Sequence, residues 1–273
     1  MGKQKKRHWI LAGTMTAAVA VGAWIAFCGY QWSWGPFARL HDIKTAGLPG
    51  NAEQYDLANV QRLTGSPLEG KHILFLGSSV TYGTASQGVS FADYIGAQNG
   101  CTITKEAVSG TTLVDSGLES YISRLKKLDA DTAADLFVCQ LSTNDATQKK
   151  PLGTVNESYD RDAFDISTVA GAIEYIISYA KESWNCPVVF YTNPQYNSAE
   201  YAAMVELLGA IQKKWDIAVI DLWSDESFSA ITPEQRELFL ADAIHPTKAG
   251  YLEWWTPYME NVLCEVIGDG KEG

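Results

Sequence analysis

The sequence lacks the residue patterns that bind zinc or nucleic acid. Its five cysteines form no C-x-x-C pair and have no metal-type spacing, so a structural zinc site is not expected. Basic residues are outnumbered, with 21 Lys and Arg against 32 Asp and Glu, and the formal net charge is −11. Proteins that bind nucleic acid use Lys and Arg to neutralise phosphate. The composition therefore excludes nucleic acid as a partner and favours neutral or weakly polar substrates.

Low-complexity tracts, Pro-rich linkers and internal repeats are also absent. A chain of 273 residues without such interruptions is better explained by one hydrophobic core than by two small domains. Changes in charge and periodicity divide the chain into four predicted parts. These are a basic cytoplasmic tail at 1–8, an uncharged segment at 9–30, a stalk and N-terminal flap at 31–70, and an α/β domain at 71–268.

Acidic residues are missing from the first 30 positions, where the charged residues are Lys3, Lys5, Lys6 and Arg7. The 22 residues from Trp9 to Tyr30 carry no formal charge. About 20 such residues span the ~30 Å of hydrocarbon in a bilayer, and a basic flank stays in the cytoplasm. The sequence therefore predicts a transmembrane signal-anchor at 9–30, with the rest of the chain outside the cytoplasm. A cleaved signal peptide is the alternative, because it shares the basic start and the apolar stretch.

Four cysteines follow this segment, and outside the cytoplasm they could form disulfides. Three of them lie at or beside apolar runs, where a free cysteine packs as a small hydrophobic residue. Buried thiols are therefore favoured, and pairing stays open for Cys101, Cys139, Cys186 and Cys264.

Five short apolar runs after residue 70 have the length and composition of strands buried on both faces. They lie at 71–77, 101–108, 135–142, 186–193 and 216–223. Helical patterns alternate with them at 91–98, 118–128, 168–183, 199–215 and 246–266, and a further short helix is expected at 52–62. Such alternation is typical of a parallel sheet with helices on both faces. Functional groups in these folds collect at the carboxyl ends of the strands.

The first strand runs into a tight, Gly-rich turn, GSSVTYG, that contains Ser79. A serine at such a strand end is a candidate nucleophile, although an ordinary Ser-rich turn explains it equally well. A phosphate-binding loop is disfavoured because no Lys follows Gly83 and the glycine spacing is wrong. The G-x-S-x-G elbow of other hydrolases is also absent.

A serine nucleophile needs a general base, and only four histidines are available. His8 belongs to the basic tail, His41 to the stalk, and His72 begins the first strand at the end remote from Ser79. His245 therefore remains as the candidate base. Three residues before it stands Asp242, a carboxylate that could orient the imidazole. A D-x-x-H pattern alone is common, so the pair gains weight only together with the serine.

Acyl transfer also needs hydrogen-bond donors for the oxyanion. Gly110 follows the second strand, where a residue without Cβ lets a backbone N–H approach a ligand. Asn144 follows the third strand and offers a side-chain amide. A turn or a helix cap would explain each of them separately. Their occurrence at successive strand ends favours a single site.

The four segments GSSVTYG, VSGTT, STND and DAIHP resemble the sequence blocks of the SGNH (GDSL-type) hydrolase superfamily in order and approximate spacing. The resemblance spans residues 71–250. It implies a three-layer α/β/α sandwich with a five-stranded parallel sheet of the flavodoxin-like type. It also implies site roles: the nucleophile, base and orienting carboxylate are Ser79, His245 and Asp242, and the oxyanion donors are the N–H groups of Ser79 and Gly110 and the amide of Asn144.

Two positions depart from the family pattern. Ser78 replaces its usual Asp and Ser142 its usual Gly, but neither position carries the chemistry in the family's mechanism. Together with the signal-anchor predicted at 9–30, the resemblance thus predicts a membrane-anchored serine esterase that hydrolyses acetyl or other acyl esters without a metal or organic cofactor. Acylated glycans and lipid or short acyl esters are the candidate substrates. The alternatives are an inactive module that binds glycans or a partner, and an acyltransferase that uses the same triad.

Overall fold

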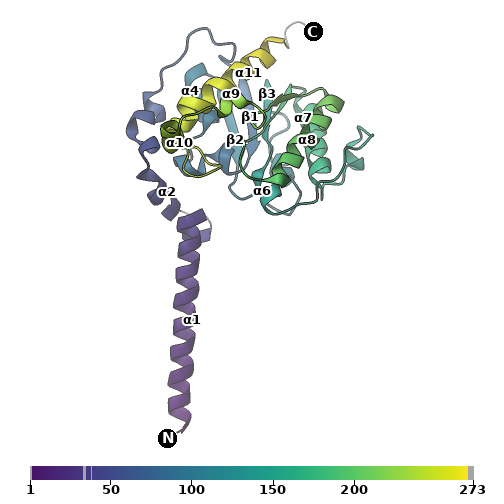
Figure 1. Cartoon of the computed structure of the whole chain (residues 1–273). Coiled ribbons are helices and arrows are strands. Elements are labelled where there is room, and N and C mark those ends of the chain that lie inside the picture. Colours follow the sequence, from purple (N-terminus) through teal and green to yellow (C-terminus); the bar gives the residue numbers. More distant parts are fainter. Residues whose placement is uncertain (1, 33–34, 38, 270–273) are drawn as a thin grey trace.

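The computed structural model describes residues 2–32, 35–37 and 39–269, and it describes side chains within 14–30, 35–37 and 39–268. Its centre is one parallel sheet with the strand order β2-β1-β3-β4-β5 (Figure 1). This order is the flavodoxin-like one, so the prediction of a five-stranded α/β fold is confirmed. The strands are β1 (His72–Gly77), β2 (Thr102–Ala107), β3 (Leu136–Gln140), β4 (Val188–Tyr191) and β5 (Ala218–Ile220).

The inner strands are apolar on both sides because each face of the sheet is covered. In β1, Leu74 and Leu76 belong to one core cluster, whereas Ile73 and Phe75 belong to the other. Successive side chains of a strand point to opposite faces, so this alternation follows from strand geometry. All five residues of β3 are buried. The continuous apolar runs of the sequence are therefore what a doubly covered parallel sheet requires.

Two groups of helices form the outer layers (Figure 1). The core on one face is completed by α5 (Tyr121–Leu125), α7 (Val169–Trp184) and α8 (Ala199–Trp215). The core on the other face is completed by α4 (Phe91–Asn99), a π-helical turn η7 (Gly250–Trp255) and α11 (Thr256–Asp269). The five predicted helices that alternate with the strands are therefore present. The one expected at 118–128 is shorter, and the last one begins as a π-helical turn.

Shorter elements lie mostly in the connections. They are α3 (Ser79–Tyr82), α6 (Thr143–Thr147), α9 (Glu226–Ser229), α10 (Pro233–Phe239), and the 3-10 turns η1 (Gly35–Phe37), η2 (Pro49–Asn51), η3 (Glu53–Tyr55), η4 (Leu57–Asn59), η5 (Thr84–Ser86) and η6 (Arg161–Ala163). The helix expected at 52–62 was wrong, because Ala52 and Asp56 are extended and divide the segment into separate turns. Hydrogen bonds from distant residues hold it there: Tyr94 Oη donates to Tyr55 O at 2.6 Å, and Lys248 Nζ lies 2.6 Å from Asp56 Oδ1.

The N-terminal segment forms α1 (Gly2–Trp32), which extends away from the domain, followed by α2 (Arg39–Ala46) (Figure 1). Helix α2 lies in the segment expected to be a stalk and was not predicted. In the described part of the chain, no helix has the length and hydropathy that crossing a membrane requires. The transmembrane segment predicted at 9–30 is therefore not supported. The side chains of residues 9–13 of that segment, and those of the basic tail, lie outside the described ones.

All five cysteines are free. Cys139 and Cys186 are buried, while Cys101 and Cys264 are partly buried. Burial raises the pKa of the Cys101 thiol to about 11 and that of Cys186 to about 11, so both stay protonated near neutral pH. These thiols act as apolar packing groups in this structure.

Candidate active site

Three side chains that are far apart along the chain form one hydrogen-bonded row. His245 Nε2 lies 2.9 Å from Ser79 Oγ, and His245 Nδ1 lies 2.8 Å from Asp242 Oδ2. A carboxylate can only accept, so Nδ1 carries the proton and donates it, which leaves Nε2 as the acceptor for the Ser79 hydroxyl. The structure thus brings together the three residues that the sequence predicted as nucleophile, base and orienting acid.

The D-x-x-H turn fixes the carboxylate of this row. Asp242 Oδ1 accepts the backbone N–H of Ile244 at 2.8 Å and that of His245 at 2.9 Å. Burial acts to raise the pKa of Asp242, but the hydrogen bond and charge of His245 and the two backbone N–H groups outweigh it and lower the pKa to about 2. Asp242 is therefore ionised at neutral pH. An ionised partner holds the imidazole in the tautomer that can accept the serine proton.

The nucleophile turn depends on a residue that the sequence analysis missed. Gln140, the last residue of β3, accepts the backbone N–H of Ser78 at 2.9 Å and the Thr81 hydroxyl at 2.8 Å. A Cβ at Gly77 would lie 1.7 Å from Thr81 Oγ1, so only glycine fits between β1 and the turn. The signal for Gln140 was a polar residue at the end of an apolar strand, LFVCQ. A buried polar side chain needs partners, and here the partners belong to the turn that carries Ser79.

The predicted oxyanion donors lie in the same cavity as Ser79. Gly110 has a φ of +80°, a conformation that favours glycine. Asn144 lies in the first turn of α6, and its backbone N–H donates to Oγ of the N-cap residue Ser142 at 3.2 Å. Its side-chain Nδ2 donates to Thr111 O at 3.0 Å, which leaves the second amide hydrogen for a substrate oxygen. The serine at 142, a departure from the family pattern, thus serves as a helix cap.

Two buried side chains hold the loop that carries Gly110. Asp145 accepts the backbone N–H groups of Leu113 at 2.8 Å and Val114 at 3.1 Å. Burial raises the pKa of Asp145 above its usual value, and these hydrogen bonds oppose that rise. At the carboxyl edge of the sheet, the acceptors of Arg124 include Gly77 O at 2.8 Å, Glu106 O at 2.8 Å and Thr111 Oγ1 at 3.0 Å. The sequence analysis did not identify Arg124.

The cavity in front of Ser79 has a volume of about 630 Å³, within the usual range for small-molecule sites. Besides the triad and the oxyanion donors, its lining includes Trp24 and Cys28 from α1 and His41 from α2. His41, which the sequence places in the stalk and N-terminal flap, thus lies at the site itself. The segment 31–70 has weak periodicity, so its sequence did not indicate that it folds back onto the site.

Some residues that follow the strand ends have structural or surface positions instead. Tyr82 and residues 193–196 do not line it within the described part of the chain. Asn193 instead holds the histidine loop, because its Nδ2 donates to Ile244 O at 3.3 Å. Lys149 pairs with Glu200 at 3.7 Å on the surface.

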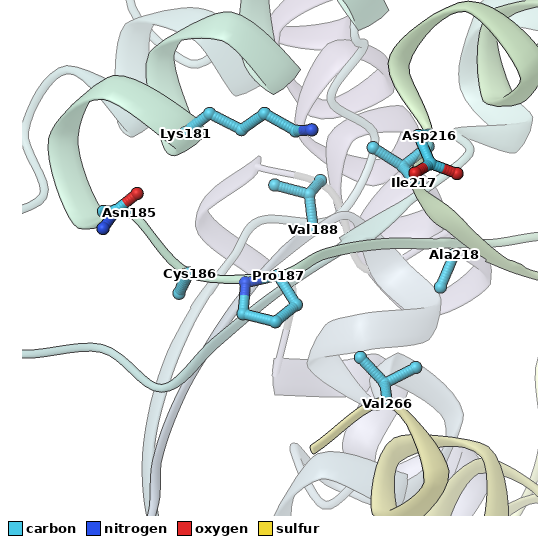
Figure 2. Close-up of a pocket in the computed structure, with 9 residues that line it drawn as sticks. All are labelled: Lys181, Asn185, Cys186, Pro187, Val188, Asp216, Ile217, Ala218 and Val266. Carbon is cyan, nitrogen blue, oxygen red and sulfur yellow. The ribbon is translucent and has the colours of Figure 1, made fainter. Parts of the chain in front are cut away.

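A second cavity, of about 620 Å³, lies at the amino ends of β4 and β5 (Figure 2). Figure 2 shows Lys181 extending from α7 toward Asp216 and Ile217, and its Nζ donates to Trp215 O at 2.9 Å. The pKa of its one thiol, Cys186, is raised, so that group is a poor nucleophile. Among the described residues, no group of three or more His, Cys, Asp or Glu is placed to hold a metal. The cavity at Ser79 is the better candidate for chemistry.

Known proteins of this kind share the fold. The GDSL-like Lipase/Acylhydrolase family model matches residues 75–252. A solved protein from Lactobacillus plantarum is 19% identical, with a TM-score of 0.57 over 71% of this chain and 97% of that one. A Bacteroides ovatus protein with the provisional name GDSL-like lipase is 19% identical, with a TM-score of 0.55 over 72% of this chain and 99% of its own. A Chitinophaga pinensis protein provisionally named a lipase is 17% identical, with a TM-score of 0.53 over 71% and 98%. No curated protein matches the chain.

The Asp145 carboxylate should matter for both the fold and the site. We expect Asp145→Ala to lower the free energy of unfolding by about 2–5 kcal/mol, because two buried N–H groups lose their acceptor. Ester hydrolysis should fall by about tenfold or more as the Gly110 loop shifts. Urea unfolding and kcat measure the two effects. Asp131→Ala, which removes an exposed carboxylate, is the control and should change neither. An unchanged unfolding curve for Asp145→Ala would contradict the role given to this residue.

Proposed function

The chain belongs to the GDSL-like Lipase/Acylhydrolase family, and on that premise we propose that it is a serine esterase that works through an acyl-enzyme. The family supports hydrolysis of ester bonds. The observation that supports the serine mechanism is the row of hydrogen bonds from Ser79 through His245 to Asp242, beside Gly110 and Asn144 in one cavity. A module that only binds glycans or a partner has no need of such a row.

The first half of the reaction forms the acyl-enzyme. His245 Nε2 takes the proton of Ser79 as Oγ bonds to the ester carbonyl carbon. The carbonyl oxygen becomes an oxyanion, which the N–H groups of Ser79 and Gly110 and the free amide hydrogen of Asn144 stabilise. The imidazolium gives its proton to the leaving alcohol oxygen as the C–O bond breaks. Throughout, the Asp242 carboxylate stabilises the positive charge on the ring.

The second half releases the acid. Water occupies the place of the alcohol, and His245 accepts one of its protons as the water oxygen bonds to the acyl carbon. The same donors stabilise the second oxyanion. The bond to Ser79 Oγ then breaks, and His245 returns the proton to the serine oxygen. An alcohol in place of this water would give acyl transfer instead, and no observation in this structure favours that outcome.

Covalent labelling tests the nucleophile directly. A fluorophosphonate should label the wild-type protein and leave Ser79→Ala unlabelled. The Ser79→Ala substitution should also lower kcat by about 10⁶-fold, the loss seen when a triad serine is removed. Ser224→Ala, which changes an exposed serine, should be labelled and active like the wild type. Full activity in Ser79→Ala would remove the proposed mechanism.

The role of the Asn144 amide can be separated from that of the triad. We expect Asn144→Ala to keep the fluorophosphonate-reactive serine but to lower kcat by about 10²–10³-fold, the contribution of one oxyanion donor. KM for a p-nitrophenyl ester should change little, because the lost bond forms mainly in the transition state. Asn261→Ala on α11 serves as the surface control. A loss seen in KM alone would assign Asn144 to ground-state binding.

The location of the protein is proposed from the sequence alone. The basic residues before the uncharged run at 9–30 support a domain placed outside the cytoplasm and retained at the membrane. The full chain should sediment with membranes, and protease added to intact cells stripped of any outer layer should degrade the domain. A version with a charged residue at Val19 should be released into the soluble fraction. Recovery of the wild-type chain in the cytosol would contradict this proposal.

A further inference from the structure

We propose that the last turns of α1 form a wall of the substrate pocket, where Trp24 and Cys28 contact an apolar chain of the ester. This inference rests on the proposed esterase function and names the substrate class of the same site. The two residues therefore determine specificity and take no part in the chemistry.

The lining of the cavity supplies the first argument. Most side chains around Ser79 are polar: hydroxyls, the Asn144 amide and the charged or titratable groups of the triad. The large apolar surface comes from Trp24 of α1, together with Ile244 beside the catalytic histidine. Cys28 adds a free thiol that is only 6% exposed. Without α1, the pocket would lose the indole of Trp24 and the thiol of Cys28 from its wall.

The end of α1 contacts both elements that follow it, η1 and α2. A Cβ at Gly29 would lie 2.4 Å from Phe37 O, so the backbones of α1 and η1 are in direct contact there. Tyr30 O accepts a hydrogen bond from His41 Nδ1 at 3.1 Å. Because His41 itself lines the cavity, this bond joins the helix end to the pocket wall.

A buried asparagine fastens α2 to both catalytic loops. Asn51 Nδ2 donates to Thr45 O, at the end of α2, at 2.9 Å and to Ala85 O, after the nucleophile turn, at 2.7 Å. Asn51 Oδ1 accepts the backbone N–H of Lys248, three residues after His245, at 2.8 Å. The N-terminal segment is thus tied to the two loops that carry the nucleophile and the base, and α1 keeps a fixed place at their rim.

The exposure of Trp24 indicates what the wall binds. The residue is 62% exposed although it lines a cavity, and its ring stacks on Phe27 at a centroid distance of 5.7 Å. An acetyl group has no chain to cover this surface, whereas a longer acyl or alkoxy chain would cover it. Each methylene buried there should raise kcat/KM by about fourfold.

The wall is also a property of this chain and not of the family domain. Trp24, Cys28 and His41 all precede residue 75, where the match to the family begins. The Lactobacillus plantarum and Bacteroides ovatus proteins are matched over 97% and 99% of their own chains but cover only 71% and 72% of this one. Specificity set by α1 would therefore differ from that of proteins that have the catalytic domain alone.

The test compares ester series on the full-length protein. One series is p-nitrophenyl esters from acetate to octanoate, and the other is acetate esters of alcohols of rising length. In the wild type, kcat/KM should rise with chain length in at least one series, which identifies the chain that meets α1. Trp24→Ala should lower kcat/KM for the longest ester of that series by about tenfold. The acetate of the smallest alcohol should change less than about twofold.

Two further variants make the result specific. Cys28→Phe adds bulk inside the pocket, so it should suppress the long ester while sparing the acetate. Val19→Ala changes another exposed apolar residue of α1 that does not line the cavity, and it should behave like the wild type. Thermal melting shows whether each variant folds.

The results distinguish failure of the pocket wall from failure of the esterase function on which it rests. If Trp24→Ala and Cys28→Phe leave the ratio of long to short ester unchanged while Ser79-dependent hydrolysis persists, the pocket wall is refuted and the esterase stands. If neither series is hydrolysed and Ser79 takes no fluorophosphonate, the proposed function itself fails. Equal losses for short and long esters would also refute the wall, because they indicate a general disturbance of the site.

Discussion

The hydrogen bond between His245 Nε2 and Ser79 Oγ, at 2.9 Å, joins residues 166 positions apart, and the rest of the molecule is arranged so that it can form. Ser79 follows β1, which lies inside the sheet between β2 and β3. His245 lies after the last strand, on a loop whose Ile244 carbonyl is held by Asn193, just beyond β4. The parallel sheet places these carboxyl ends at one edge, so its topology decides whether base and nucleophile meet.

Buried polar side chains then fix the loops at that edge more tightly than apolar packing would. Gln140 holds the nucleophile turn, Asp145 and Arg124 hold the loop of Gly110, and Asn51 joins the N-terminal segment to both catalytic loops. A buried polar group costs free energy unless its partners are in place. Each of these residues therefore penalises any displacement of the backbone that it binds. Preorganised donors are what an oxyanion requires, because they need no rearrangement during the reaction.

The sequence could predict the parts whose pattern is local. The buried strands and the long helices α7 and α8 have continuous apolar runs or helical periodicity, whereas the roles of nucleophile, base and oxyanion donors were implied by the resemblance to the SGNH sequence blocks. The segment 31–70 could not be predicted in this way. Its turns are held by partners such as Tyr94 and Lys248, which are distant in sequence. For the same reason the sequence did not indicate that His41, assigned to the stalk, lines the cavity of Ser79.

The membrane location and the pocket wall that are proposed for α1 involve the same residues. The uncharged run at 9–30 is long enough for hydrocarbon, but Trp24 and Cys28, near its end, line the catalytic cavity. Residues that contact substrate beside Ser79 cannot also lie deep in a bilayer. The stretch that remains, 9–23, is about 22 Å long as a helix, shorter than the ~30 Å of hydrocarbon. A membrane location and the pocket wall are therefore compatible only where the bilayer surface meets the rim of the cavity. In that arrangement an apolar chain could pass from lipid to Ser79 along α1 without crossing water.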